Sequence, residues 1–170
     1  MLTMKLAADM VAEFKNRVNE MLPKSAEQNA EIQKRLIDEE IKELTNEFAF
    51  INVDVNCNYD FMQLISNCHD LHIIKQRNAN MLKELCDVIY VVAGMDLVKG
   101  TQTDKSKILD TYLTNVATDT LRSLITEAFT AVHSSNMMKV KAPVIVDGKI
   151  QKGENYIKPN LQAIIDKYIQ

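Results

Sequence analysis

The stretch MLKELCDVIYVVAGMDLVKG, residues 81–100, is apolar almost all round between Leu85 and Met95. A helix that is hydrophobic on every side is normally enclosed by other elements of the same protein. Gly100 follows the stretch and is a typical residue to end a helix. The stretch therefore predicts a central helix over residues 80–99, around which the other helices pack.

Length and composition predict one all-α domain over residues 1–170. A chain of 170 residues is the size of a single domain and can bury a core of ordinary size. Its 46% apolar and 25% charged residues are typical of a globular protein, and four Gly and three Pro leave room for few turns. The net charge of −3 gives no basic footprint for nucleic acid, so we expect no nucleic-acid partner.

The sequence also favours a cytoplasmic protein without a membrane partner. Lys5 and Asp9 interrupt the first apolar pattern, which therefore cannot be the apolar core of a signal peptide. No segment approaches the roughly 18 uninterrupted apolar residues of a membrane span. The three cysteines form neither a CxxC pair nor an even disulfide set, which fits a reducing compartment.

Apolar residues at three- and four-residue spacing predict further helices around the central one. The first ends at Pro23, and the second begins with a capping box formed by Ser25 and Gln28. One or two later helices are broken near Thr118, and Asp147-Gly148 predicts a two-residue β-hairpin turn. The predicted helices cover residues 4–22, 25–51, 61–76, 108–133 and 160–170.

Two acidic motifs carry the chemistry of the sequence. Glu39, Glu40 and Glu43 lie within one turn and a half of helix 25–51, and Glu84 and Asp87 lie one turn apart on helix 80–99. If the two helices pack antiparallel, the carboxylates face each other across a gap the size of one ion. Without a cation, they would raise one another's pKa.

The ligand type indicates which ion fits. Carboxylate oxygens are hard donors that suit Mg²⁺ or Mn²⁺, whereas zinc prefers His and Cys. A di-iron bundle would need His where Glu43 and Asp87 stand. The pattern EExxE alone is common on solvated helix faces, but the ExxD pair lies in the most apolar helix, where unpaired carboxylates are costly to bury. Together the motifs predict a magnesium site, with manganese as the alternative ion.

The motif EExxE followed by ExxDVIYVVAGM resembles the all-α nucleoside triphosphate pyrophosphohydrolases, the group of MazG-like proteins, dimeric dUTPases and phosphoribosyl-ATP pyrophosphatase. The segments HSSNMMKV and DGKIQKGENYIKP, within residues 133–159, are similar to the SNMSK…DGK…KGxxY ending of a bacterial and phage subgroup. The resemblance covers residues 10–165. The sequence departs from the pattern in a longer interval between Glu43 and Glu84, in Met138 for Ser and in Asn160 for Asp.

The resemblance implies a MazG-like helical bundle, a homodimer or higher homo-oligomer, and Mg²⁺-dependent cleavage of a nucleoside triphosphate to the monophosphate and pyrophosphate. The metal ligands that it implies are Glu40, Glu43, Glu84 and Asp87. Glu39 is the candidate general base, with Glu43 as its rival. The C-terminal hairpin and tail, residues 136–170, supply the candidate substrate-binding residues Asn136, Lys139, Lys152 and Tyr156.

Two alternatives remain open at the level of sequence. The first is hydrolysis of phosphoribosyl-ATP, which shares the metal motif and the reaction; a free nucleotide is favoured because this chain is longer and has the additional tail. The second is a non-enzymatic helical interaction module whose acidic face is merely solvated. The preferred base also stays open among uracil, cytosine and damaged nucleotides.

Overall fold

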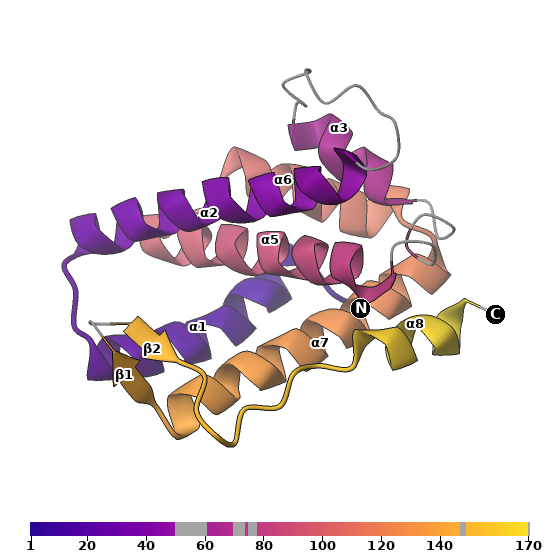
Figure 1. The fold of residues 1–170 in the computed structure, drawn as a ribbon. Coiled ribbons are helices and arrows are strands. Elements are labelled where there is room, and N and C mark those ends of the chain that lie inside the picture. The colour runs from indigo at the N-terminus through magenta and orange to yellow at the C-terminus, as the bar shows by residue number, and fades with distance from the viewer. Residues whose placement is uncertain (50–60, 70–73, 75–77, 147–148, 170) are drawn as a thin grey trace.

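The computed structural model describes residues 1–49, 61–69, 74, 78–146 and 149–169. Helices dominate these residues, and one short antiparallel hairpin lies near the C-terminus (Figure 1). The all-α class with a C-terminal hairpin is thereby confirmed. In chain order the elements are α1 (Met4–Met21), α2 (Ala26–Ala49), α3 (Phe61–Ser66), the 3₁₀ turn η1 (Asn67–His69), α5 (Asn78–Lys99), α6 (Asp104–Thr111), the π-helical turn η2 (Tyr112–Val116), α7 (Asp119–Lys141), β1 (Val144–Val146), β2 (Lys149–Gln151) and α8 (Leu161–Tyr168).

Helix α5 is the centre of the fold, as its composition predicts. From residue 85 to residue 95 every side chain is buried except that of Asp87, which is half-buried. The helix packs against α1, α2, α6, α7 and α8, so that its apolar surface is covered from several sides. Figure 1 shows α2 running antiparallel to α5, and α1 and α7 lying together on the other side of α5. The two helices that carry the acidic motifs are therefore direct neighbours.

Local capping fixes where the helices around α5 begin. Ser25 and Gln28 form the predicted capping box, in which each backbone N–H donates to the other side chain, at 3.0 and 3.2 Å. The Thr118 hydroxyl accepts from the Leu121 N–H and starts α7, so the predicted break near Thr118 is confirmed. Helix α7 continues beyond the predicted end at residue 133, and Ser135, Met137 and Val140 in this continuation are also buried.

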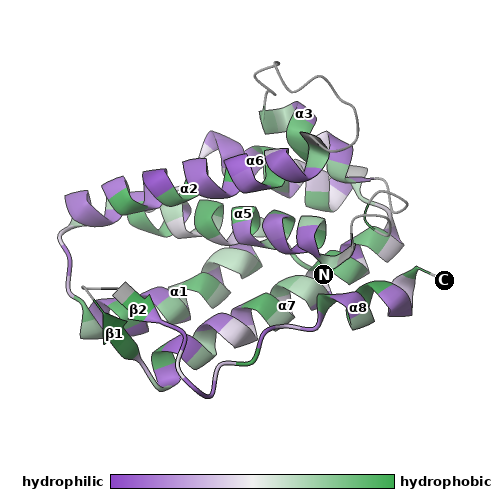
Figure 2. Ribbon diagram, in the orientation of Figure 1, coloured by the Kyte–Doolittle hydropathy of each residue, from purple (hydrophilic) through white to green (hydrophobic). Residues whose placement is uncertain are grey.

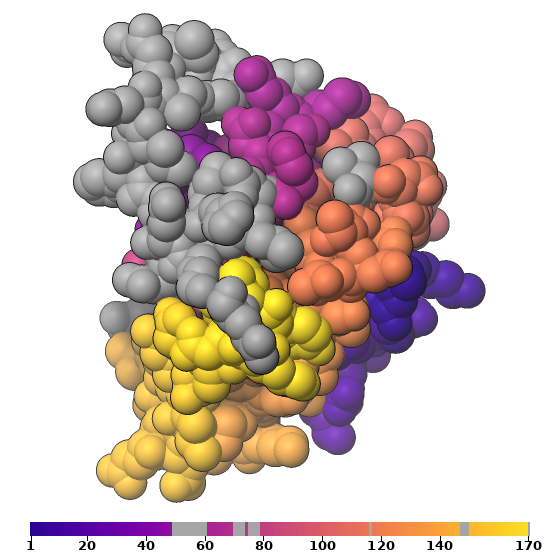
Figure 3. All heavy atoms as spheres, turned by 90° about the vertical axis from the view of Figure 1, so that its right-hand side faces the viewer, coloured from indigo at the N-terminus to yellow at the C-terminus, as the bar shows by residue number. Residues whose placement is uncertain are grey.

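The region between α2 and α5 differs from its prediction. A helix over residues 61–76 was expected, but α3 ends at Ser66 and continues as the 3₁₀ turn η1. The rest of that prediction apart from residue 74, the end of α2 beyond residue 49 and the hairpin turn at 147–148 lie outside the described residues. Figure 3, viewed from the side on which both termini lie, shows α3 against α6 and η2, and α8 against α7.

The C-terminal segment folds back along α7. The two strands pair Val144 with Gln151 and Val146 with Lys149, and the Ser135 hydroxyl on α7 donates to the Ile157 carbonyl oxygen at 2.7 Å. Figure 2 shows β1 as strongly hydrophobic, although its three residues are about half exposed. Asn160 caps α8, a role in which Asn and Asp are equivalent. None of the described helices is both long enough and apolar enough to cross a membrane.

Candidate metal centre and ligand cavity

Three of the predicted metal ligands meet where α2 and α5 pack together. Glu40 on α2 and Glu84 and Asp87 on α5 each offer one carboxylate oxygen, and these oxygens lie within 4.8 Å of one another. The spacing of three residues places Glu84 and Asp87 on one side of α5, and the antiparallel neighbour brings Glu40 to the same side. Glu84 is buried, while Glu40 and Asp87 are half-buried.

The other two predicted acidic residues lie outside this group. Glu43 is exposed, although its negative charge is near enough to raise the pKa of Glu40 and of Glu84. Glu39 is also exposed, lies 3.6 Å from the Arg35 guanidinium and lines the cavity described below. The structure thus brings together Glu40, Glu84 and Asp87, places Glu39 at the edge of the cavity, and leaves Glu43 exposed near the group.

The local electrostatics disfavour charge on the cluster. Burial, with the negative charges of Asp87 and Glu43 next in importance, raises the pKa of Glu40 from its ordinary value of 4.5 to about 7. Burial also raises the pKa of Glu84, against the opposing effect of Lys83. The Oε2 atom of Glu40 is buried and finds no hydrogen-bond partner within the described part of the chain. Such an orphaned carboxylate oxygen is costly unless a cation or a proton satisfies it.

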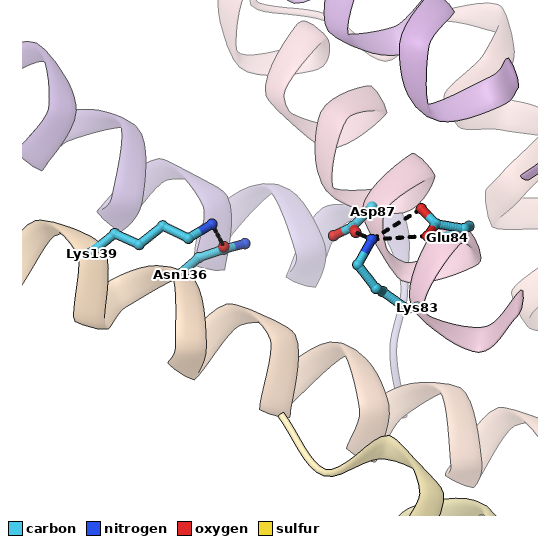
Figure 4. Close-up of polar contacts among 5 residues, drawn as sticks. All are labelled: Lys83, Glu84, Asp87, Asn136 and Lys139. Atoms are coloured by element: carbon cyan, nitrogen blue, oxygen red, sulfur yellow. Dashed lines mark hydrogen bonds and ion pairs between the residues drawn. The ribbon is translucent and has the colours of Figure 1, made fainter. Parts of the chain in front are cut away.

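Lys83 is the cation that these carboxylates contact. Its ammonium lies 2.8 Å from Asp87 Oδ2, 2.9 Å from Glu84 Oε1 and 3.1 Å from Glu84 Oε2 (Figure 4). Burial alone lowers the pKa of Lys83, but the charge and hydrogen bonds of Asp87 and Glu84 outweigh it and raise the pKa above its ordinary value. Lys83 therefore stays charged, and it neutralises part of the cluster without reaching the orphaned Glu40 oxygen.

The residues present fit a hard divalent cation. All three donors are carboxylate oxygens, and together they can approach one ion from two helices. The orphaned Glu40 oxygen is the observation that favours an ion, because a purely structural cluster of this kind would have that atom paired. Mg²⁺ and Mn²⁺ both suit such a donor set, and either would leave positions for water and ligand oxygens.

A cavity of about 850 Å³ opens beside the cluster, and Glu40 and Asp87 form part of its wall. This volume is within the usual range for small-molecule sites. The cavity lies between α1, α2 and α5 on one side and α7 with the C-terminal segment on the other. Its basic side chains are Lys24, Arg35, Lys83, Lys139, Lys152 and Lys158. Acidic and basic groups thus face a common space.

The four predicted substrate-binding residues form one group on the wall opposite the acidic cluster. Lys139 donates to Asn136 Oδ1 at 2.7 Å, and both side chains come from α7 (Figure 4). The Tyr156 ring has the ammonium groups of Lys139 and Lys152 at 5.6 and 5.0 Å from its centre. Burial lowers the pKa of Lys139. A partly dehydrated cation of this kind interacts strongly with an incoming anion.

The remaining wall of the cavity is apolar and aromatic. Phe14 on α1 meets Tyr90 on α5 edge to face, with ring centres 5.8 Å apart, and Val18 and Leu36 extend the surface. The Tyr90 hydroxyl lies 3.3 Å from His133 Nδ1 on α7. The cavity therefore offers apolar, acidic and basic surfaces to the same ligand.

Sequence reasoning missed Lys83, Arg35 and Lys158 as residues of the site. A usable signal existed for Lys83, because it stands four residues before Asp87, the spacing of a helical ion pair. No such local signal marks Arg35 or Lys158, which reach the cavity only through the packing of α2 and of the C-terminal segment.

No protein-family model matches the chain, and neither a curated protein nor a solved structure shows significant similarity to it.

Proposed function

We propose that this protein is a Mg²⁺-dependent nucleoside triphosphate pyrophosphohydrolase. The observation that carries the proposal is the convergence of Glu40, Glu84 and Asp87, from two helices, beside a cavity whose wall includes Glu40 and Asp87 and, on the side of α7 and the C-terminal segment, Lys139 and Lys152. The motif resemblance points to the same reaction. A metal-bound triphosphate complements this pattern of charge in the cavity. Its cation faces the carboxylates, and its free phosphate oxygens face the lysines.

The division of charge across the cavity explains how the chain would hold such a ligand. Three carboxylates repel a bare triphosphate, and they accept one only together with a divalent cation. Lys139 and Lys152, on the far wall, pair with phosphate oxygens that the metal does not cover. The apolar surface of Phe14, Val18 and Leu36 can contact the base and sugar at the other end of the cavity.

In the proposed reaction, water attacks the α-phosphorus and the bond from that phosphorus to the bridging oxygen breaks. The nucleoside monophosphate and pyrophosphate leave, and the water loses a proton. Bound Mg²⁺ would neutralise phosphate charge and lower the pKa of water near it. Glu39 lines the cavity and can accept the proton, while Lys139 and Lys152 stabilise the charge that develops on pyrophosphate.

The non-enzymatic alternative has less support. On a merely solvated acidic face both Glu39 and Glu43 would be exposed, and both of them are. Glu84, however, is only 8% exposed, and Glu40 has a buried oxygen without a partner in the described ranges of the chain; neither is expected on a solvated face. Phosphoribosyl-ATP remains the second candidate substrate, because it presents the same triphosphate to the same walls.

Pyrophosphate release tests the proposal most directly. Purified protein with Mg²⁺ should release pyrophosphate from at least one member of a panel of nucleotides that includes phosphoribosyl-ATP. Calorimetric titration of Mg²⁺ with a non-hydrolysable nucleotide should show binding in the wild type and none in Asp87→Asn. The matched control is Asp38→Asn, an exposed carboxylate on α2 outside the cavity wall, which should bind like the wild type. Equal heats in Asp87→Asn and Asp38→Asn would support the interaction module.

A further inference from the structure

The position of Lys83 carries an inference that rests on the metal site of the proposed function. Its ammonium bridges Asp87 and Glu84 at 2.8 and 2.9 Å, so it contacts two of the three carboxylates that a divalent ion would use. The third carboxylate, that of Glu40, keeps a buried oxygen that has no hydrogen-bond partner among the residues that the structure describes. Lys83 thus neutralises two of the carboxylates that a metal ion would bind, and it leaves one oxygen of Glu40 without a partner among the described residues.

An ammonium and a divalent ion compete for these carboxylates, because two cations a few ångströms apart in a half-buried site repel each other strongly. The doubly charged ion also reaches three carboxylates, whereas Lys83 reaches two. Occupation of the cluster by a metal ion therefore favours movement of Lys83 away from it.

The cavity is where the displaced side chain can go. Lys83 is one of the residues that line it, its side chain is 37% exposed, and its four-carbon stem is flexible. Asn136 and Lys139 lie on the facing helix α7 (Figure 4). An ammonium that turns from the carboxylates into this space joins the basic wall and meets the anionic part of the ligand.

We propose that Lys83 is a built-in counter-ion that holds Glu84 and Asp87 in the metal-free protein, and that it transfers to the phosphate groups of the ligand when a divalent cation takes the carboxylates. Metal binding and anion binding are then coupled through one side chain. The metal frees the ammonium for phosphate, and phosphate gives the ammonium a partner that replaces the carboxylates.

The proposal predicts opposite effects of one substitution on two ligands. Lys83→Met should bind Mn²⁺ alone at least about fivefold more tightly than the wild type, because no ammonium competes for the carboxylates. The same variant should bind the Mn²⁺ complex of inorganic triphosphate at least about fivefold more weakly, because a phosphate contact is lost. Lys99→Met is the matched control, with the same change of charge at an exposed position on the same helix, and should behave like the wild type.

Mn²⁺ binding can be followed by the electron paramagnetic resonance signal of the unbound ion. Thermal melting shows whether each variant folds. Unchanged or weaker Mn²⁺ binding in folded Lys83→Met would overturn the inference and identify the ion pair as a permanent structural contact, while leaving the proposed function intact. Absence of Mn²⁺ binding in the wild type as well as in Lys83→Met would overturn both.

A measurement on the unmodified protein gives an independent test. The rate at which an amine-directed reagent labels Lys83, read by mass spectrometry, should rise several-fold when Mn²⁺ is added, while labelling of Lys99 stays constant. Equal labelling of Lys83 with and without Mn²⁺, at concentrations where the ion is bound, would contradict the transfer.

Discussion

Two polar clusters lie between α2 and α5, two helical turns apart along α2. They differ in whether their polar atoms have hydrogen-bond partners. In the first, the Lys15 ammonium donates to Gln33 Oε1 at 2.5 Å, and Gln33 Nε2 donates to the Val91 carbonyl oxygen at 2.6 Å. In the second, Glu40, Glu84 and Asp87 crowd together, and one Glu40 oxygen has no partner among the described residues.

The first cluster is complete and closely packed. Gln33 is only 3% exposed, and both ends of its amide are used, so that α1, α2 and α5 are joined through one side chain. Gly94 makes room for it, since a Cβ atom there would stand 2.8 Å from Gln33 Nε2 and from Lys15 Cε. A buried polar group that is fully paired in this way stabilises one arrangement of the helices.

The comparison separates a structural use of buried polarity from a functional one. In the first cluster, both ends of the Gln33 amide have a partner from the chain itself. Where a ligand is expected, the chain leaves an oxygen unpaired and keeps the pKa of Glu40 near 7, at a cost in stability. Each of the following changes tests that distinction.

The largest effect is expected from Glu40→Gln. Loss of one carboxylate should reduce pyrophosphate release by at least about 100-fold, since even indirect supports of metal sites are worth 10- to 100-fold. The metal-free variant should nevertheless melt at a higher temperature than the wild type at pH 8, because a half-buried charge has been removed.

Glu20→Gln, an exposed change on α1, is the control for Glu40→Gln and should alter neither quantity. A lower melting temperature in Glu40→Gln would show that Glu40 stabilises the fold and would remove the contrast with Gln33.

Gln33→Leu should have the opposite effect on stability. It leaves the half-buried Lys15 ammonium without its acceptor, and we expect the free energy of unfolding to fall by about 2 kcal/mol. The double variant Lys15→Met with Gln33→Leu should recover much of this loss, because both polar partners are then replaced together. Urea denaturation of these two variants measures the effect, with Gln63→Leu on the exposed side of α3 as control.

The smallest effect concerns pH. Between about pH 4.5 and about pH 7 the folded protein keeps a proton on Glu40 that the unfolded chain has already lost. The folded state therefore binds more protons, and the free energy of unfolding of the metal-free protein falls as the pH rises through this window. Because Glu40 is partly exposed, we expect a loss of only about 1 kcal/mol.

Denaturation at pH 5 and pH 8 in the presence of a chelator tests the pH effect. Glu40→Gln should show a smaller difference between the two values than the wild type does, and an equal difference would assign the titration to another group.

Features that depend on short-range chemistry could be predicted from the sequence. The capping box at Ser25, the break at Thr118 and the enclosed helix α5 each follow from residues a few positions apart. The convergence of Glu40 with Glu84 and Asp87 needed one further assumption, that α2 and α5 pack antiparallel, and the structure has them so.

Features that depend on how elements rotate and pack could not be predicted. Glu43 has the same three-residue spacing from Glu40 that brings Glu84 and Asp87 together on α5, yet it is exposed, because the rotation of α2 against α5 gives the buried position to Leu44. The Lys15–Gln33 pair joins two helices whose relative placement no local pattern specifies. The same is true of the basic residues that line the cavity, of which Arg35 and Lys158 come from segments far apart in the chain.

The order in which the residues that line the cavity occur in the sequence has a consequence for synthesis of the protein. The acidic residues belong to α2 and α5, whereas Lys139, Lys152 and Lys158 follow at least 40 residues after the end of α5 at Lys99. During translation the acidic helices leave the ribosome first, before their basic counterpart exists. Lys83 stands between the two acidic motifs in sequence, and so the nascent chain already contains a cation that can shield the cluster until the C-terminal third arrives.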